Sequence, residues 1–129
     1  MENGVVNITR EREALATIKR VARTTNSIER MKGLLGTAAL TIDQGMWLSA
    51  CNSIHTFFMG YDLDIVYLDG DQKICRLVST IKPWRVDFCL RARSVLEIRS
   101  GEIDRLGLAL GDHIHWEASS ETHRETNKI

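Results

Sequence analysis

The 129-residue sequence is short of four things: proline, cysteine, an excess of one charge, and long apolar runs. Its 17 basic and 17 acidic residues give a formal net charge of zero, whereas dedicated nucleic-acid-binding domains carry a basic excess. No apolar run approaches the roughly 20 residues that span a bilayer. The polar stretch 1–12 is not a secretory signal, and three cysteines, an odd number, are typical of thiols kept reduced. We therefore predict a cytoplasmic protein with no nucleic-acid partner and no membrane insertion.

The remaining composition is that of one ordinary globular domain. Hydrophobic residues make up 43% of the chain and charged residues 26%, which is enough apolar surface for a single core. No linker divides the chain. We expect a short amino-terminal segment at 1–14, a β-rich domain at 15–117, and a polar, flexible tail at 118–129.

The apolar pattern predicts a mainly β fold, that is, a β-rich α+β barrel or sandwich with two short helices. The run Asp64–Leu68 is β-favouring and apolar on both faces, and the Asp69-Gly70 pair after it is a hairpin signal. Alternation puts Ile114 and Trp116 on one face of the last strand. Strands are predicted over 5–8, 15–21, 45–50, 64–68, 73–81, 95–98 and 113–117.

Two segments show helix signals. The first runs from Ser27, a potential N-cap, to Gly36, a potential stop, with apolar residues at helical spacing between them. The second is one or two turns between Ser100, as the cap, and Gly107, as the stop.

The zero net charge conceals charged segments of opposite sign. Residues 45–75 contain only Lys73 against four aspartates. Residues 76–99 contain six basic residues against Asp87 and Glu97. If the two segments are neighbours in the fold, these charges can pair across strands; otherwise they form two different faces.

The densest group of candidate functional residues is the stretch 51–59, Cys-Asn-Ser-Ile-His-Thr-Phe-Phe-Met. It combines small hydrogen-bonding side chains with apolar ones between two predicted strands, and connecting segments often carry function. Such a mixture suits a ligand whose apolar part is buried and whose polar end is fixed. Our leading hypothesis is a non-enzymatic binding or accessory module that binds an unidentified small molecule or protein. Its candidate residues are Arg30, Cys51, Ser53, His55, Thr56 and Asp64.

An enzyme is the competing hypothesis. A helical turn would bring Cys51 and His55 together, with Cys51 as nucleophile, His55 as base and Asp64 as the orienting carboxylate. The structural alternatives are a small buried Cys51, a hydrogen-bonded buried His55, and an Asp64 that accepts backbone amides from a nearby loop.

A metal site is a further possibility. Cys51, His55, His113 and His115 are potential ligands, and the last two share one strand face. The spacing matches none of the common metal motifs, since there is no Cys-x-x-Cys and no His-Glu-x-x-His. We predict no metal and no cofactor. The segment Lys82-Pro83-Trp84-Arg85 places a cation beside an aromatic ring, which suits anion binding; the structural alternative is that Trp84 is a core or rim residue.

Several motifs recur in an order that resembles the family called domain of unknown function 192, over about residues 15–117. They are Arg-Met-Lys-Gly-Leu-Leu-Gly at 30–36, the 51–59 stretch, Leu-Asp-Ile-Val-Tyr-Leu-Asp at 63–69, Pro-Trp-Arg at 83–85, Val-Leu-Glu at 95–97 and Gly-Asp at 111–112. The resemblance implies a compact, mostly β domain with short helices and no established activity or cofactor. It draws attention to Arg30, Gly33, Cys51, His55, Thr56, Met59, Asp64 and Glu97. This chain departs from the family pattern at Ala50 and Asp62, where proline is usual.

Overall fold

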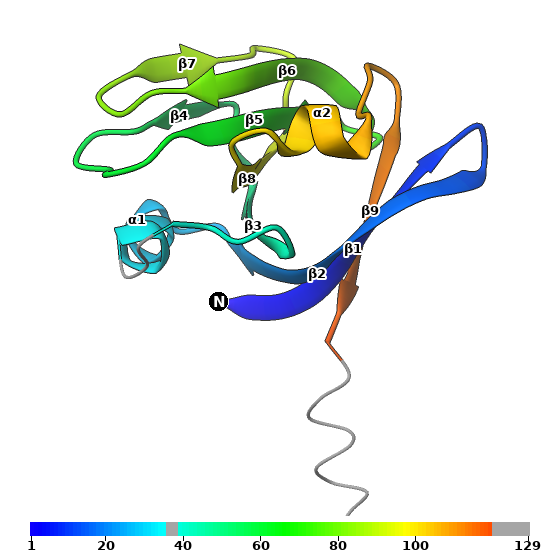
Figure 1. The fold of residues 1–129 in the computed structure, drawn as a ribbon, viewed down its shortest axis with the longest axis horizontal. Coiled ribbons are helices and arrows are strands. Elements are labelled where there is room, and N and C mark those ends of the chain that lie inside the picture. Colours follow the sequence, from blue (N-terminus) through cyan, green and yellow to red (C-terminus); the bar gives the residue numbers. More distant parts are fainter. Residues whose placement is uncertain (36–38, 120–129) are drawn as a thin grey trace, which may run out of the picture.

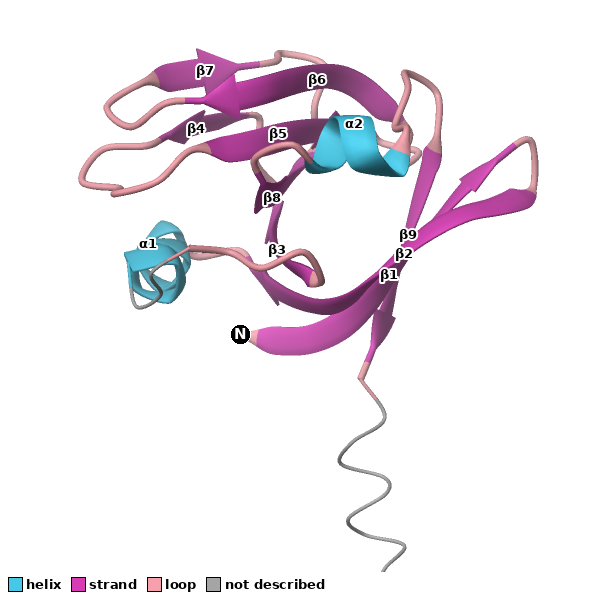
Figure 2. Ribbon diagram, in the orientation of Figure 1, coloured by secondary structure: helices cyan, strands magenta, loops and turns pink. Residues whose placement is uncertain are grey.

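The structure, a computed structural model, describes residues 1–35 and 39–119. It is mostly β, as predicted, with two short helices (Figures 1 and 2). A seven-stranded sheet has the order β6-β5-β8-β3-β2-β1-β9, and β4 pairs with β7 in a separate two-stranded sheet. The elements are β1 (Glu2–Arg10), β2 (Glu13–Thr24), α1 (Ser27–Leu35), β3 (Gln44–Ser49), β4 (Ser53–His55), β5 (Leu63–Leu68), β6 (Ile74–Ile81), β7 (Val86–Phe88), β8 (Ser94–Arg99), α2 (Glu102–Leu106) and β9 (His113–Ala118).

The large sheet is antiparallel except at one pair. β1 and β2 form a hairpin, and β5 and β6 form the hairpin that Asp69-Gly70 predicts, in which Asp69 Oδ1 accepts the amide of Lys73 at 3.0 Å. β2 and β3 are parallel, which requires a connection that returns along the sheet. α1 lies in that connection, so the crossover places α1 beside β2 and β3 (Figure 1).

The sheet curls until its two edge strands meet at one end only. The edges touch at a single bridge between Lys73 and His113, where the amide of Ile114 donates to the carbonyl of Gln72 at 2.9 Å. β6 and β9 do not pair along their lengths. The predicted barrel is therefore not a closed one, because only the turn before β6 reaches β9.

Both faces of the curled sheet carry a core. β5 shows why: all six of its residues are buried, with Val66 and Leu68 packed in one cluster and Ile65 and Tyr67 in the other. The first cluster lies among β1, β2, β9 and α2. The second lies beneath α1 and the small sheet, so it supports the elements that carry the 51–59 stretch.

The helix caps differ from the predicted ones. At α1 the cap is Asn26, whose Oδ1 accepts the amide of Ile28 at 2.8 Å, rather than Ser27. At α2 the cap residue is Gly101 with φ +95° and not Ser100; Gly107 ends the helix with φ +69°, as predicted. The predicted stop at Gly36 and the predicted tail from 120 to 129 lie outside the described residues.

The small sheet was not predicted. β4 and β7 have three residues each, too few for alternation to show, and the 30 residues 56–85 separate the two paired strands. Because residues 53–55 form a strand, the helical turn that would join Cys51 to His55 is absent from this described segment. Within the described residues, neither helix is long and apolar enough to span a membrane.

Candidate functional site

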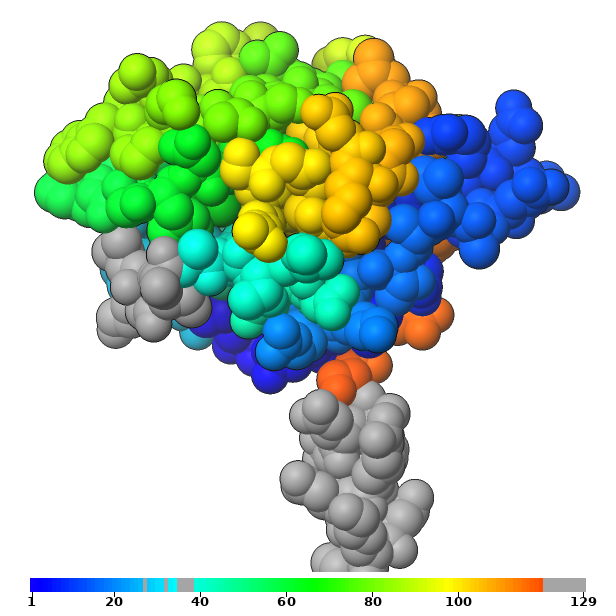
Figure 3. All heavy atoms as spheres, in the orientation of Figure 1, coloured from blue at the N-terminus to red at the C-terminus, as the bar shows by residue number. Residues whose placement is uncertain are grey.

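The outward face of the small sheet is apolar and exposed. In its register Ser53 lies opposite Phe88, and His55 opposite Val86, so these four side chains share one face. Val86 is 64% exposed and Phe88 58% exposed, whereas Ile54 on the other face is buried. In Figure 3 the green and yellow-green residues around this sheet form the upper left of the molecule.

An aromatic cluster continues this face through the turn after β4. The rings of His55 and Phe57 stack at 4.8 Å, Phe57 lies 5.8 Å from Trp84, and Phe58 meets Trp84 edge-on at 4.8 Å. Phe58 and Trp84 remain 70% and 56% exposed. We call this surface the aromatic face: His55, Phe57, Phe58, Trp84, Val86 and Phe88.

Two bulky residues of the aromatic face have strained backbones. Phe58 has φ +66° and Trp84 has φ +62°, in the left-handed region that side chains with a Cβ disfavour. Each such residue costs on the order of 1 kcal/mol, and such strain is concentrated at functional sites. The fold therefore retains an unfavourable backbone at Phe58 and Trp84, two of the three residues of this face whose rings are largely exposed.

Thr56 holds the two halves of the aromatic face together. It is fully buried, and its hydroxyl donates to the carbonyl of Lys82 at 2.7 Å while accepting the amide of Arg85 at 2.9 Å. Its own carbonyl accepts the amides of Trp84 at 3.0 Å and Met59 at 3.3 Å. One side chain and its peptide group thereby fix the turn after β4 against the segment before β7.

Asp87 fastens β7 to the main sheet. Its Oδ2 accepts the hydroxyl of Tyr67 at 2.7 Å, and its Oδ1 accepts Nη2 of Arg76 at 3.0 Å. Burial, and then the hydrogen bond to Asp87, raise the pKa of Tyr67, so this phenol stays protonated and remains a donor. β7 is held from its inner side, which leaves Val86 and Phe88 facing outward.

A buried ion pair supports β4 from below. Arg30 of α1 donates from Nε to Oε1 of Glu97 in β8 at 2.6 Å, and both side chains are almost completely buried. Nη2 of Arg30 also donates to the carbonyl of His55 at 3.0 Å. Burial raises the pKa of Glu97, against the opposing effect of the Arg30 charge. α1, β8 and β4 are thus joined through one guanidinium.

The His55 ring is neutral at the aromatic face. Burial, and then the Arg30 charge, lower the pKa of His55. Its Nδ1 accepts the amide of Phe57 at 3.3 Å, a role that only an unprotonated nitrogen can fill. His55 therefore acts as an uncharged aromatic ring stacked on Phe57.

Cys51 and Ser53 belong to a different cavity. Sγ of Cys51 donates to the carbonyl of Ser53 at 2.9 Å, and both residues line a hollow of about 450 Å³ with Ala92 and Arg93. Ala50, where the family pattern has proline, lines it too and has φ +52°, an angle that a proline ring excludes.

Asp64 does not lie at His55. Its carboxylate is fully buried and accepts three backbone amides: that of Thr80 at 2.7 Å, Gly101 at 3.0 Å and Ile103 at 2.9 Å. This arrangement caps α2 from a strand 37 positions earlier. The structure therefore places His55 in the aromatic face and Arg30 and Thr56 buried beneath it. Ser53 lies at the edge of the same sheet face, in the hollow with Cys51, and Asp64 lies at α2.

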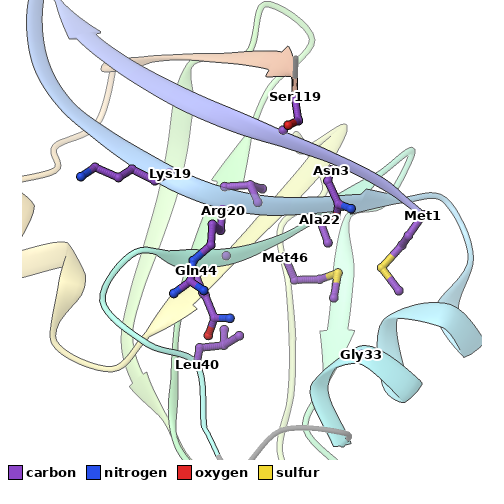
Figure 4. A pocket seen from close by; sticks show the side chains of 13 residues that line it. Met1, Asn3, Lys19, Arg20, Ala22, Gly33, Leu40, Gln44, Met46 and Ser119 are labelled. Atoms are coloured by element: carbon purple, nitrogen blue, oxygen red, sulfur yellow. The ribbon is translucent and has the colours of Figure 1, made fainter. Parts of the chain in front are cut away.

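A larger hollow lies elsewhere on the sheet. It has a volume of about 490 Å³ and is lined by Ala22 and Met46 of the sheet, Gly33 of α1, Leu40, and the polar Lys19 and Arg20 (Figure 4). Of the residues that the family resemblance singles out, Gly33 lines this hollow; the six candidate binding residues, from Arg30 to Asp64, do not. Among the described residues no three His, Cys, Asp or Glu side chains come together as a metal site.

Sequence reasoning missed part of the aromatic face. Val86 and Phe88 carried no signal, because a three-residue strand cannot show its exposed face by alternation alone. Glu97 was indicated only through the family resemblance, since a buried carboxylate within an apolar strand is recognisable only once its partner Arg30 is placed beside it.

The fold and site define a small β-rich domain with an exposed aromatic face held by a buried polar frame. The DUF192 family, described as uncharacterized ACR, matches residues 6–116, and the chain belongs to this family. A UPF0127 protein of Thermococcus sibiricus is 36% identical over 70 residues, which are 54% of this chain and 45% of that protein. A UPF0127 protein of Pyrococcus horikoshii is 37% identical over 65 residues, which are 50% of this chain and 56% of that protein. The chain matches about half the length of these relatives.

The fold is also found in a solved structure. A protein of unknown function from Novosphingobium aromaticivorans superimposes with a TM-score of 0.72 at 24% identity, covering 87% of this chain and 84% of that protein. At this level of identity the likeness shows a shared fold.

Proposed function

We propose that this protein is a non-enzymatic binding module whose binding surface is the aromatic face, with the 51–59 stretch at its centre. The observation that supports this most is the backbone strain at Phe58 and Trp84, which keeps two large rings exposed side by side. Exposed contiguous aromatic surface marks interaction sites, and aromatic residues dominate the energetics of interfaces.

The partner we propose is a protein segment with apolar side chains flanked by acidic residues. Residues 82–93, which carry much of the aromatic face, contain four exposed basic residues against one aspartate. Arg76 already neutralises that aspartate and Asp62 pairs with Lys82, so three of the four basic residues make no ion pair among the described residues. An acidic partner would be attracted to this charge, while its apolar side chains would cover the rings. The basic residues are Lys82, Arg85, Arg91 and Arg93.

A non-enzymatic role is supported by the separation of the groups that an enzyme would need. Cys51 is engaged with Ser53, and the carboxylate of Asp64 is occupied by backbone amides. A cytoplasmic location, inferred from the cysteine content, also belongs to the proposal. If Cys51 were instead a nucleophile, its alkylation rate against pH would show a depressed thiol pKa, and the enzyme hypothesis would replace this one.

The test is selection from a displayed random peptide library against the full chain. We expect enriched peptides to carry aromatic or branched apolar residues next to Asp or Glu. The variant Trp84→Ser should weaken binding of a selected peptide by about 30-fold, the factor that corresponds to about 2 kcal/mol at an interface hot spot.

Leu110→Ser is the matched control, because Leu110 is 67% exposed and lies outside the aromatic face. It should leave peptide binding unchanged. Equal loss in both variants, or no effect of Trp84→Ser, would contradict the proposal. If no peptide is enriched and the wild-type chain instead sediments with phosphatidylglycerol vesicles, the aromatic face would be assigned to binding a membrane surface.

A further inference from the structure

Two thiols that play no part in the aromatic face lie against each other. Sγ of Cys75 in β6 is 3.8 Å from Sγ of Cys89, which follows β7. Both residues are half-buried rather than enclosed. A disulfide has its sulfurs about 2.05 Å apart, so the two atoms must approach by less than 2 Å to bond.

The backbone on each side can accommodate that approach. Cys75 is skipped in the register between β5 and β6, since Tyr67 pairs with Arg76 and Leu68 pairs with Ile74. It is thus the extra residue of a β-bulge, a feature that redirects a side chain and loosens the local ladder. Cys89 begins a short turn in which the amide of Ala92 donates to its carbonyl at 3.0 Å.

We propose that Cys75 and Cys89 are an oxidation site that closes to an intramolecular disulfide on exposure to a small disulfide oxidant. The bond would tie β6 to the end of β7. This inference does not depend on the proposed function, because the two thiols meet whether or not the aromatic face binds a partner.

The chemistry is thiol–disulfide exchange with a glutathione-type disulfide. The thiolate of Cys89 attacks the oxidant, forming a mixed disulfide and releasing one reduced glutathione. Cys75, after losing its proton to solvent, attacks the sulfur of Cys89 and releases the second. Two protein thiols and one oxidised glutathione give one protein disulfide and two reduced glutathiones.

Burial, and then the hydrogen bond with Cys89, raise the pKa of Cys75 to about 11. Little of this thiol is ionised at neutral pH, so closure is expected to be slow near pH 7 and to accelerate as the pH rises. Cys51 provides an internal comparison, since its Sγ donates to the carbonyl of Ser53 instead of facing a second thiol.

The experiment incubates the folded full chain with oxidised glutathione, alkylates the remaining thiols, and maps the products by mass spectrometry. We expect the mass of the protein to fall by two hydrogen atoms. Alkylation should be found at one thiol, that of Cys51, and the map should contain a peptide that links Cys75 to Cys89. Cys51→Ser should keep the link, and Cys89→Ser should abolish it.

Three outcomes would overturn the assignment. They are three alkylated thiols after incubation, a stable glutathione adduct on Cys89 without the link, or a link that includes Cys51. Because the wild-type chain alone distinguishes these outcomes, the test does not depend on a variant that folds poorly.

Discussion

Breaking the ion pair between Arg30 and Glu97 should destabilise the whole domain. Both side chains are buried, and the 2.6 Å contact between Nε and Oε1 is the link between α1 and β8. The second oxygen of Glu97, Oε2, is buried with no hydrogen-bond partner among the described residues. Removing one partner therefore leaves an uncompensated buried charge, whereas removing both leaves none.

The size of the effect follows from that difference. Replacing one partner, as in Arg30→Met or Glu97→Met, should lower the free energy of unfolding by about 3 to 5 kcal/mol. With a urea m-value of about 2 kcal/mol per M, the midpoint moves down by about 1.5 to 2.5 M. The double variant should be more stable than either single variant, because two apolar side chains of similar length can pack where the ion pair lay.

The assay is a double-mutant cycle by urea unfolding, with Lys82→Met as control. Lys82 makes an ion pair with Asp62 at the surface, with its own side chain 64% exposed, so its loss should cost at most about 1 kcal/mol. In Arg30→Met the carboxyl of Glu97 loses its counter-ion, and its pKa in the folded state rises further. The protonated form of Glu97 then folds more favourably. The loss in free energy of unfolding of Arg30→Met relative to wild type should therefore shrink as the pH falls from 8 towards the unfolded glutamate pKa of about 4.3.

Additive single effects below about 1 kcal/mol each would refute the reasoning, since they would mean that the two charges are solvated. A loss in free energy of unfolding of Arg30→Met that grows as the pH falls would also refute the reasoning, because protonation of Glu97 must remove the unpaired charge.

Three further predictions concern buried polar side chains of the domain. Asp64→Ala removes the acceptor for three backbone amides and should lower the free energy of unfolding in urea by about 3 kcal/mol. Thr56→Val removes the hydroxyl that bonds to the carbonyl of Lys82 and the amide of Arg85, and leaves both groups unpaired. It should lower the free energy of unfolding in urea by about 2 kcal/mol and weaken peptide binding at the aromatic face. The Arg10 guanidinium lowers the pKa of Asp112, so this carboxylate stabilises the fold above its unfolded pKa and the contribution disappears as the pH falls through its folded pKa. Asp112→Asn should therefore melt below wild type at pH 7, and the difference in melting temperature should narrow as the pH falls below the unfolded pKa of about 3.9.

Most of the fold could be predicted from patterns among residues close together in the sequence. The Asp69-Gly70 turn and the doubly apolar run in β5 both depend on neighbours within a few positions, and both lie where the pattern predicts. The caps were less predictable, because a helix amide donates its hydrogen bond to whichever oxygen the fold brings near. At α2 that oxygen comes from Asp64, 37 positions away from Gly101, and not from Ser100 beside it.

The candidate site was readable only in part, for the same reason. The sequence indicated His55 and Thr56 through their place among polar and aromatic neighbours. It gave no sign that Thr56 bonds to the segment before β7, or that Arg30 reaches the carbonyl of His55, because both contacts join residues at least 25 positions apart. Periodicity carries no information about such contacts.

The most direct test of the aromatic face is a backbone-amide NMR map of the labelled full chain, titrated with a peptide selected from the library. We expect the largest shift changes on residues 53–58 and 84–88, and Trp84→Ser should shift this titration to about 30-fold higher peptide concentration. Changes concentrated instead at the hollow lined by Ala22, Gly33 and Met46 would contradict it, because none of the exposed rings lines that hollow.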